Sequence, residues 1–331
     1  MSLVDFDKLF TNFSSIKVAV IGDVMLDTYM WGKVERISPE APVPVVSLKK
    51  KDYRIGGAGN VALNLRSLNA NVAVLSVIGK DDDGIALKKL FDENKINTDF
   101  LLSSSNRVTT NKIRVISRNQ QMLRLDNEVT HDLGYEDENR LVLAMQQFIA
   151  QEKPQVVIFE DYNKGVLTEL VIQKTIALCR HHGIITTVDP KRKNFFSYIG
   201  VDIFKPNLKE VKEGLNIIDD GVSEELLQQV HRSLKEKLTH HISFITLSEH
   251  GVYYEDGNHH HIIPSHLRNI ADVSGAGDTV IAVASLIYTA TKDVRLMAEI
   301  ANIAGGLVCE EVGTVAIDKE KLLKECKLLV P

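Results

Sequence analysis

The residues best suited to chemistry lie in the segment DVSGAGD, residues 272–278, at the start of an apolar run that extends to Tyr288. Gly275 and Gly277 allow backbone N–H groups to converge where a helix begins, and the helix dipole favours negative charge there. Asp278 would repel a bound phosphate, but a carboxylate can take the proton from a hydroxyl group that attacks phosphorus. The alternative is a simple helix cap worth about 1 kcal/mol. This motif alone leaves both interpretations open.

A second glycine-rich segment, IGGAGNVALN, occupies residues 55–64. Gly57, Gly59 and Ala62 fit the G-x-G-x-x-A pattern of dinucleotide-binding folds, and the acidic residues 81–83 follow at about the spacing of a ribose contact. An NAD-dependent oxidoreductase is therefore one alternative. However, that fingerprint directly follows a buried strand, and the segment before it here, LKKKDYR, is polar.

The same glycines also allow a purely structural interpretation, a turn in front of a helix that Asn60 caps. Such a turn would not need the three glycines Gly56, Gly57 and Gly59. Their excess indicates a backbone that comes close to a polar ligand.

Two further pairs of polar residues follow predicted strands. Asp23 and Asp27 flank the end of the first apolar strand, where a carboxylate can accept hydrogen bonds from sugar hydroxyls. Asn207 and Glu210 are three residues apart and so share one face of a turn or helix. Glu210 could hold magnesium-bound water beside a polyphosphate. The structural alternative for Glu210 is a solvated side chain at a helix start.

Around these motifs, apolar strand patterns alternate with amphipathic helix patterns. Strands are predicted at residues 16–23, 71–79, 155–161 and 184–190, with helices between them. This alternation favours an α/β domain with a doubly wound, mainly parallel sheet that helices cover on both faces. Such folds bind ligands beyond the carboxyl ends of their strands.

Two segments interrupt this rhythm, at about residues 31–54 and 109–126. The first contains several prolines, and the second alternates polar and apolar residues like a half-exposed hairpin. We expect both to form a small β-sheet lid over the carboxyl ends of the main strands. Because no repeat, low-complexity tract or linker interrupts the chain, we expect a single domain over residues 1–331.

Composition narrows the function classes. The net charge is −5 with both signs mixed along the chain, which argues against a nucleic-acid partner. No apolar stretch is long enough to span a bilayer, and the N-terminus lacks the pattern of a signal peptide. The three widely spaced cysteines suit a reducing compartment. We therefore expect a cytoplasmic protein with no membrane partner.

Taken together, the motifs resemble those of the ribokinase-like (PfkB) carbohydrate kinases, and the resemblance covers nearly the whole chain. It rests on GGAGNVA at residues 56–62, TLSEHG at residues 246–251 and DVSGAGD at residues 272–278. Segments at residues 22–46, 114–126, 161–165 and 189–191 further resemble the kinases of this family that act on D-glycero-β-D-manno-heptose 7-phosphate. The family implies a three-layer ribokinase-like fold, with ATP and Mg²⁺ as cofactors.

The resemblance also implies roles for individual residues. Asp278 would be the catalytic base, and the anion-hole amides would come from Gly275, Ala276 and Gly277. The sugar would be held by Asp27, Gly56, Gly57 and Asn60. The nucleotide site would include Asn207, Glu210, Thr246, Gly251 and Asn302, with Glu210 acting on magnesium through water. The chain departs from the family's usual pattern at Val273, Ser274 and Ser248, which bears on the nucleotide contacts more than on the chemistry.

A substrate that already carries a phosphate needs a cationic anchor away from ATP. Four basic residues fall in the segments that resemble the heptose kinases: Arg118, Arg124, Lys164 and Lys191. Arginine suits a bidentate grip on phosphate, and lysine acts as a point charge. For each of the four, a solvated surface charge is the alternative, so the prediction concerns the group.

The resemblance implies phosphorylation of the anomeric hydroxyl of heptose 7-phosphate to the 1,7-bisphosphate, a step of ADP-heptose (lipopolysaccharide core) biosynthesis. Bifunctional relatives also carry a nucleotidyltransferase domain, and we expect none here. Alternatives are a kinase for another sugar or a nucleoside, the oxidoreductase, and a non-catalytic sugar-phosphate sensor. Family members often pair through their lids, so we expect a homodimer through the alternating apolar residues Ile113, Val115, Leu123 and Leu125.

Overall fold

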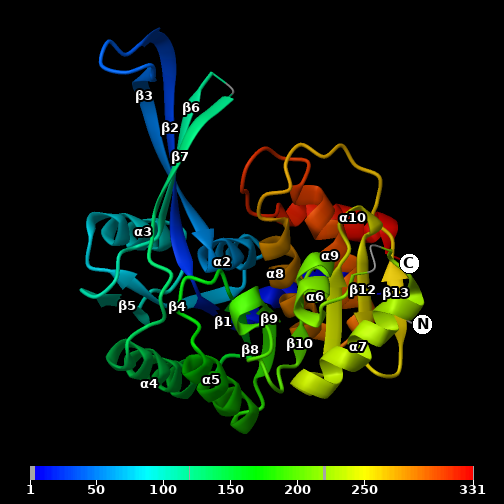
Figure 1. The fold of residues 1–331 in the computed structure, drawn as a ribbon. Helices are drawn as coiled ribbons and strands as arrows, with labels where there is room; N and C mark the ends of the chain where they lie inside the picture. The colour runs from blue at the N-terminus through cyan, green and yellow to red at the C-terminus, as the bar shows by residue number, and fades with distance from the viewer. Residues whose placement is uncertain (1–3, 119, 219–220, 331) are drawn as a thin grey trace.

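The computed structural model describes residues 4–118, 120–218 and 221–330, and within them it contains one large and one small β-sheet (Figure 1). The large sheet has nine strands in the order β13-β12-β11-β10-β9-β8-β1-β4-β5. Its strands are β1 (Lys17–Gly22), β4 (Asn71–Gly79), β5 (Leu101–Ser104), β8 (Val156–Glu160), β9 (Ile185–Asp189), β10 (Ile203–Phe204), β11 (Ile242–Thr246), β12 (Val252–Glu255) and β13 (His260–Ile263).

The large sheet is parallel except at one edge, where β12 and β13 run antiparallel to their neighbours. Its central strands are buried on both faces, which explains their nearly continuous apolar sequences. In β8, Val156 and Ile158 pack into one hydrophobic cluster, whereas Val157 and Phe159 pack into the other. This alternation predicts that Glu160, the last residue of β8, points to the same face as Ile158.

Ten helices cover the two faces of the large sheet within the described residues. They are α1 (Phe6–Asn12), α2 (Ala58–Ser67), α3 (Asp82–Glu93), α4 (Tyr135–Glu152), α5 (Glu169–His181), α6 (Leu208–Leu215), α7 (Glu224–Leu238), α8 (Ala276–Thr291), α9 (Val294–Val308) and α10 (Lys319–Leu329). The cluster on one face includes α1, α2, α8, α9 and α10, and the cluster on the other includes α4, α5 and α7. Among the described residues, none of these helices has both the length and the apolar character needed to cross a membrane.

The small sheet consists of two hairpins that project beyond the large sheet (Figure 1). It has the order β3-β2-β6-β7, from β2 (Val24–Ile37), β3 (Pro44–Gly57), β6 (Asn111–Ser117) and β7 (Gln120–Asn127). We call this sheet the lid. It starts earlier than the predicted segment, because β2 begins at Val24, two residues after β1 ends. Asp27 therefore belongs to a lid strand.

The carboxyl ends of the parallel strands bring most of the polar residues to one edge of the large sheet. The strand order reverses between β1 and β8, and Asp23 and Asp161 directly follow these two strands. Asp189 ends β9, and Lys205 directly follows β10. The start of α8 packs beside this edge, since α8 contacts β8 and β9. This is the place where folds of this class bind ligands.

Candidate active site

Asp278 lies in the first turn of α8 and is 5% exposed. Its Oδ2 accepts a hydrogen bond from the Asn60 side-chain amide at 2.7 Å, and its Oδ1 accepts one from the Tyr162 hydroxyl at 2.7 Å. Gly275 occupies the N-cap position of α8, without a side-chain hydrogen bond. Asp278 is therefore not the helix cap. Burial raises its pKa to about 6, against the opposing effect of the Asn60 and Tyr162 hydrogen bonds.

The backbone at the start of α8 presents unpaired N–H groups. Those of Gly275, Gly277 and Asp278 have no hydrogen-bond acceptor among the described residues. The Ala276 N–H instead donates to the Val273 carbonyl oxygen, at 3.3 Å. Three free amides at a helix N-terminus can bind a negatively charged group. Compared with the predicted set, the Asp278 amide is free and the Ala276 amide is not.

A row of buried and partly buried charges lies beside these amides. Lys205, 2% exposed, donates from Nζ to Asp189 Oδ2 at 2.8 Å. Lys191 bridges Asp189 at 2.9 Å and Glu210 at 2.8 Å. A Cβ atom added to Gly277 would lie 3.5 Å from Asp189 Oδ2 and 3.9 Å from Lys205 Nζ. The Lys205 ammonium group thus lies close to Gly277, where it adds positive charge beside the free amides.

The two lysines keep the carboxylate of Asp189 ionised. Burial favours the neutral form of Asp189, but Lys191 and Lys205 outweigh it and lower the pKa of Asp189. In contrast, Glu160 is fully buried, and neither of its carboxylate oxygens has a hydrogen-bond partner among the described residues. Burial raises the pKa of Glu160 well above its ordinary value, and Asp189 and Asp278 add to this effect.

Asn207 and Glu210 form a capping box at the start of α6. The Asn207 side chain accepts from the Glu210 N–H at 2.8 Å, and Glu210 Oε2 accepts from the Asn207 N–H at 2.8 Å. Because Lys191 takes Oε1, both carboxylate oxygens of Glu210 are engaged. Asn207 also pairs with Thr246 in an isolated parallel bridge, so these two predicted nucleotide residues are neighbours.

The remaining predicted nucleotide residues lie near the β11–β13 edge. Ser248, one of the positions where the sequence departs from the pattern it resembles, has φ 54°, the left-handed conformation that glycine adopts most easily. Gly251 precedes β12 and would clash with the Ile263 carbonyl if it carried a side chain. Asn302, on α9, donates to the Pro264 carbonyl oxygen at 2.9 Å.

The predicted sugar residues meet where β2 and β3 leave the large sheet. A Cβ at Gly56 would clash with the Asp27 carboxylate, and Gly57, with φ 60°, is the N-cap of α2. The prediction that Asn60 caps this helix is wrong, because α2 begins at Ala58. Asn60 lies inside the first turn, where its amide is free to hold Asp278.

The four predicted cationic anchors do not form one cluster, although Arg124 and Lys164 belong to one network of ion pairs through Lys112. Arg124 makes two hydrogen bonds to Asp126, at 2.8 and 2.6 Å, and Lys164 pairs with Glu128 at 2.6 Å. Lys191 lies with Asp189 and Glu210, beside the predicted nucleotide residues. Arg118 is exposed in the turn between β6 and β7. Three of the four are therefore neutralised by carboxylates.

Sequence inspection missed Tyr162, Lys205, Asp189 and the structural role of Asp23. Asp23 is 1% exposed and accepts hydrogen bonds from the N–H groups of Tyr162, Lys164 and Val166, at 2.9, 3.0 and 3.0 Å. It thereby shapes the loop that presents Tyr162 to Asp278. The sequence carried one usable signal: Lys205 is the one charge in the otherwise apolar run IFKP, residues 203–206.

The geometry does not support the dinucleotide alternative. The glycine segment spans the end of β3, a lid strand, and the start of α2, and it does not follow a strand of the large sheet. Asp81, from the acidic cluster, caps α3 and accepts from the Gly84 and Thr109 N–H groups at 2.8 Å each. Gly59 lies against Ile55 and Phe91, so its smallness serves packing.

Comparison with known proteins gives the chain a family. A model described as pfkB family carbohydrate kinase matches residues 15–321. The bifunctional protein HldE of Geotalea uraniireducens is 38% identical over 329 residues, which are 98% of this chain and 66% of that protein. The HldE of Syntrophotalea carbinolica is 36% identical over 326 residues, 97% of this chain and 65% of that protein. The chain thus spans just under two thirds of the length of these relatives.

Two solved structures share the fold. Phosphofructokinase-2 from Escherichia coli, in complex with potassium, superposes with a TM-score of 0.77 at 16% identity, covering 94% of this chain and 99% of that one. Arabidopsis thaliana ribokinase, complexed with ribose and ATP, superposes with a TM-score of 0.71 at 16% identity, covering 93% of this chain and 99% of that one. The buried Asp278 carboxylate beside the free amides of α8 is consistent with the family model that matches residues 15–321. The chain belongs to the pfkB family of carbohydrate kinases.

Proposed function

We propose that this protein transfers the γ-phosphoryl group of ATP to the anomeric hydroxyl of D-glycero-D-manno-heptose 7-phosphate, forming the 1,7-bisphosphate. The observation that carries the phosphoryl-transfer chemistry is the Asp278 carboxylate, buried beside three unpaired backbone N–H groups. The choice of heptose 7-phosphate is supported by the segments that resemble the heptose kinases and by the similarity to HldE proteins. The proposed biological role is ADP-heptose synthesis.

In this mechanism Asp278 takes the proton of the attacking hydroxyl. Asn60 and Tyr162 fix the direction of its carboxylate and leave it ionised above about pH 6. The amides of Gly275, Gly277 and Asp278, with Lys205 behind them, stabilise the negative charge on the transferred phosphoryl group. An anomeric hydroxyl is more acidic than an ordinary alcohol, so one carboxylate base is adequate.

The residues present fit ATP and Mg²⁺. When bound, these supply the phosphoryl group and a cation that offsets phosphate charge. Asn207, Thr246, Gly251 and Asn302 lie on the nucleotide side of the site in this proposal. Since both oxygens of Glu210 are already engaged, Glu210 would act on magnesium through water.

The proposal is tested by ADP release with a panel of acceptors. We expect turnover with heptose 7-phosphate to exceed, in kcat/KM, turnover with ribose, fructose, fructose 6-phosphate and nucleosides. Faster turnover of an unphosphorylated sugar would instead identify a kinase for that sugar. Tight binding of NAD without binding of ATP, measured by calorimetry, would reject the kinase proposal altogether.

The raised pKa of Asp278 predicts how activity depends on pH. Below its pKa of about 6 the carboxyl group is protonated and cannot accept the proton. We therefore expect kcat/KM to rise with pH up to about 6 and then to level off, because kcat/KM reports ionisations of the free enzyme.

The same profile has an internal control. The Tyr162 hydrogen bond lowers the pKa of Asp278, so Tyr162→Phe should move the inflection to higher pH. A profile that stays flat well below the pKa in the unmodified protein would remove Asp278 as the base.

We further propose a homodimer formed through the lid. The strand register places Thr28, Tyr53, Ile113 and Leu125 on one face of the lid, next to Leu123 and Val115. Tyr53, Leu123 and Leu125 are 39%, 51% and 48% exposed, an unusual cluster for a free surface.

Sedimentation equilibrium tests the dimer. We expect the unmodified protein to have the mass of two chains and Leu123→Glu with Leu125→Glu to have the mass of one. Arg118→Glu, in the exposed turn of the same hairpin, is the control and should remain dimeric. A monomer mass for the unmodified protein at all concentrations would contradict the proposal.

A further inference from the structure

The face of the lid opposite the apolar one carries Asp27, Tyr29, Arg54 and Arg114 side by side. In the antiparallel pair of β2 and β3, Asp27 lies directly opposite Arg54. In the parallel pair of β2 and β6, Tyr29 lies directly opposite Arg114. Because Asp27 and Tyr29 are two residues apart on one strand, all four side chains leave the same face.

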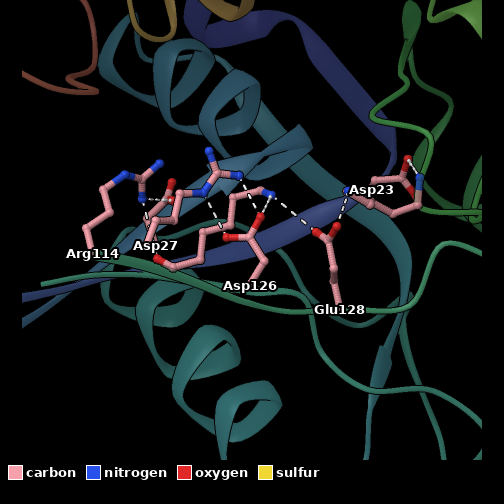
Figure 2. A network of polar contacts seen from close by, with 8 residues as sticks. Asp23, Asp27, Arg114, Asp126 and Glu128 are labelled. Atoms are coloured by element: carbon pink, nitrogen blue, oxygen red, sulfur yellow. Dashed lines mark hydrogen bonds and ion pairs between the residues drawn. The ribbon is translucent and has the colours of Figure 1, made fainter. Parts of the chain in front are cut away.

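Tyr29 holds both arginines in place. The Arg54 guanidinium lies 4.6 Å from the centre of the Tyr29 ring, and the Arg114 guanidinium lies 5.2 Å from it. Trp31 stacks on the same ring, with the centroids 6.1 Å apart. Arg114 Nη1 also donates to Asp27 Oδ1 at 2.5 Å (Figure 2). The two cations are therefore fixed beside the proposed sugar ligand Asp27.

These groups offer donors without acceptors. The Arg54 side chain makes no hydrogen bond or ion pair with any residue in the described part of the chain, and neither does the Tyr29 hydroxyl group. Arg114 uses only Nη1, for Asp27 and the Lys112 carbonyl oxygen, so its other N–H groups are unpaired among the described residues. Of the two guanidinium groups, only that of Arg114 is paired with a carboxylate.

The neighbouring cations of the lid are different. Figure 2 shows Asp126 and Glu128 continuing the row from Asp27 toward Asp23. Lys112 pairs with both Asp126 and Glu128, at 3.3 and 3.2 Å. Two of the predicted anchors pair with one of these carboxylates each: Arg124 with Asp126 and Lys164 with Glu128. The excess positive charge of this face therefore lies at Arg54 and Arg114.

We propose that Arg54, Arg114 and the Tyr29 hydroxyl bind the phosphate group that the sugar already carries. This rests on the proposed function, since it names the residues that would select a phosphorylated acceptor. The paired N–H groups of a guanidinium match the oxygens of a phosphate monoester. The Tyr29 ring holds both guanidinium groups while leaving N–H groups unpaired for the phosphate. Asp27, bonded to Arg114, joins this phosphate site to the sugar site.

The same chemistry could serve the γ-phosphate of ATP. Arg54 also lies near the loop that follows α9, because a Cβ atom added to Gly313 would lie 3.1 Å from Arg54 Nη1. The next residue, Thr314, lies near the start of α8, because a Cβ atom added to Gly275 would lie 3.0 Å from Thr314 Cγ2. The contact of Arg114 with Asp27, the proposed sugar ligand, favours the phosphate of the acceptor. The experiment must therefore separate the two phosphates.

The test is Arg54→Gln with two acceptors, heptose 7-phosphate and unphosphorylated D-glycero-D-manno-heptose. We expect kcat/KM for the phosphorylated acceptor to fall about 100-fold, mostly through KM, which is the range of a lost charge-assisted bidentate contact. Arg54→Lys, which keeps the charge, should recover about tenfold of this loss. With the unphosphorylated acceptor, Arg54→Gln should change kcat/KM by less than about threefold. Lys51→Gln is the matched control, because Lys51 lies on the same strand with its ammonium against Tyr53 on the other face.

Equal losses with both acceptors, or a raised KM for ATP, would assign Arg54 to the nucleotide and overturn the inference. An unchanged KM for heptose 7-phosphate would overturn it as well. If the unmodified protein does not use heptose 7-phosphate at all, the proposed function fails first, and the two failures are thus distinct.

A measurement on the unmodified protein serves if Arg54→Gln does not fold. Inorganic phosphate should inhibit competitively against heptose 7-phosphate and leave turnover of the unphosphorylated heptose unchanged. Competition against ATP alone would overturn the inference.

Discussion

We expect Asp278→Asn to lower kcat at least about 100-fold while ATP binds with unchanged affinity, because it removes the general base and little else. Asparagine has nearly the same shape as aspartate. Its side chain can still accept one hydrogen bond, and the Tyr162 hydroxyl can turn to accept one. ADP release measures kcat, and calorimetry measures the affinity for ATP.

Asp293→Asn is the matched control for this substitution. Asp293 caps α9 by accepting from the Leu296 N–H at 2.9 Å, and asparagine is an equally good cap. We expect this variant to retain full activity and stability. Near-normal turnover by Asp278→Asn would remove Asp278 from the chemistry and leave only the helix-start amides.

Lys205→Met should affect both stability and catalysis. It breaks the buried pair with Asp189, which typically destabilises a fold by about 3–5 kcal/mol because one charge is left unpaired. It also removes the cation beneath Gly277, and the loss of one such group from an anion site lowers kcat about 100- to 1000-fold. Urea unfolding and ADP release measure the two effects separately.

A double variant separates these effects. Lys205→Met with Asp189→Leu removes both charges, while Lys191 keeps its contact with Glu210. We expect the double variant to regain most of the lost stability but none of the lost activity. Lys209→Met, at an exposed lysine on α6, should change neither. Normal turnover by the double variant would mean that Lys205 serves the fold alone.

The sequence was most informative where local pattern determines structure. The apolar runs that became β1, β4, β8 and β9 are buried on both faces of a parallel sheet, so their composition identifies them. The glycines before Asp278 likewise mark the start of α8. Family resemblance then supplied the roles of residues that no local pattern could assign.

The sequence was least informative where side chains distant in the chain meet. Asn60 was expected to cap a helix, but it holds Asp278, 218 positions away. Lys191 was expected to anchor the substrate, yet Glu210 and Asp189 draw it toward the nucleotide residues. Arg54 was not singled out, because its lack of a partner depends on the register of β2 and β3. Charge pairing is a property of the folded chain, and composition does not specify it.

The most direct test of the central claim is the identity of the product. After incubation with ATP, Mg²⁺ and heptose 7-phosphate, ³¹P NMR should show a second sugar-phosphate resonance, coupled to the anomeric proton. Loss of this resonance in Asp278→Asn would tie the product to the proposed base. A new phosphate on any other carbon, or no bisphosphate while another sugar is phosphorylated, would contradict the account.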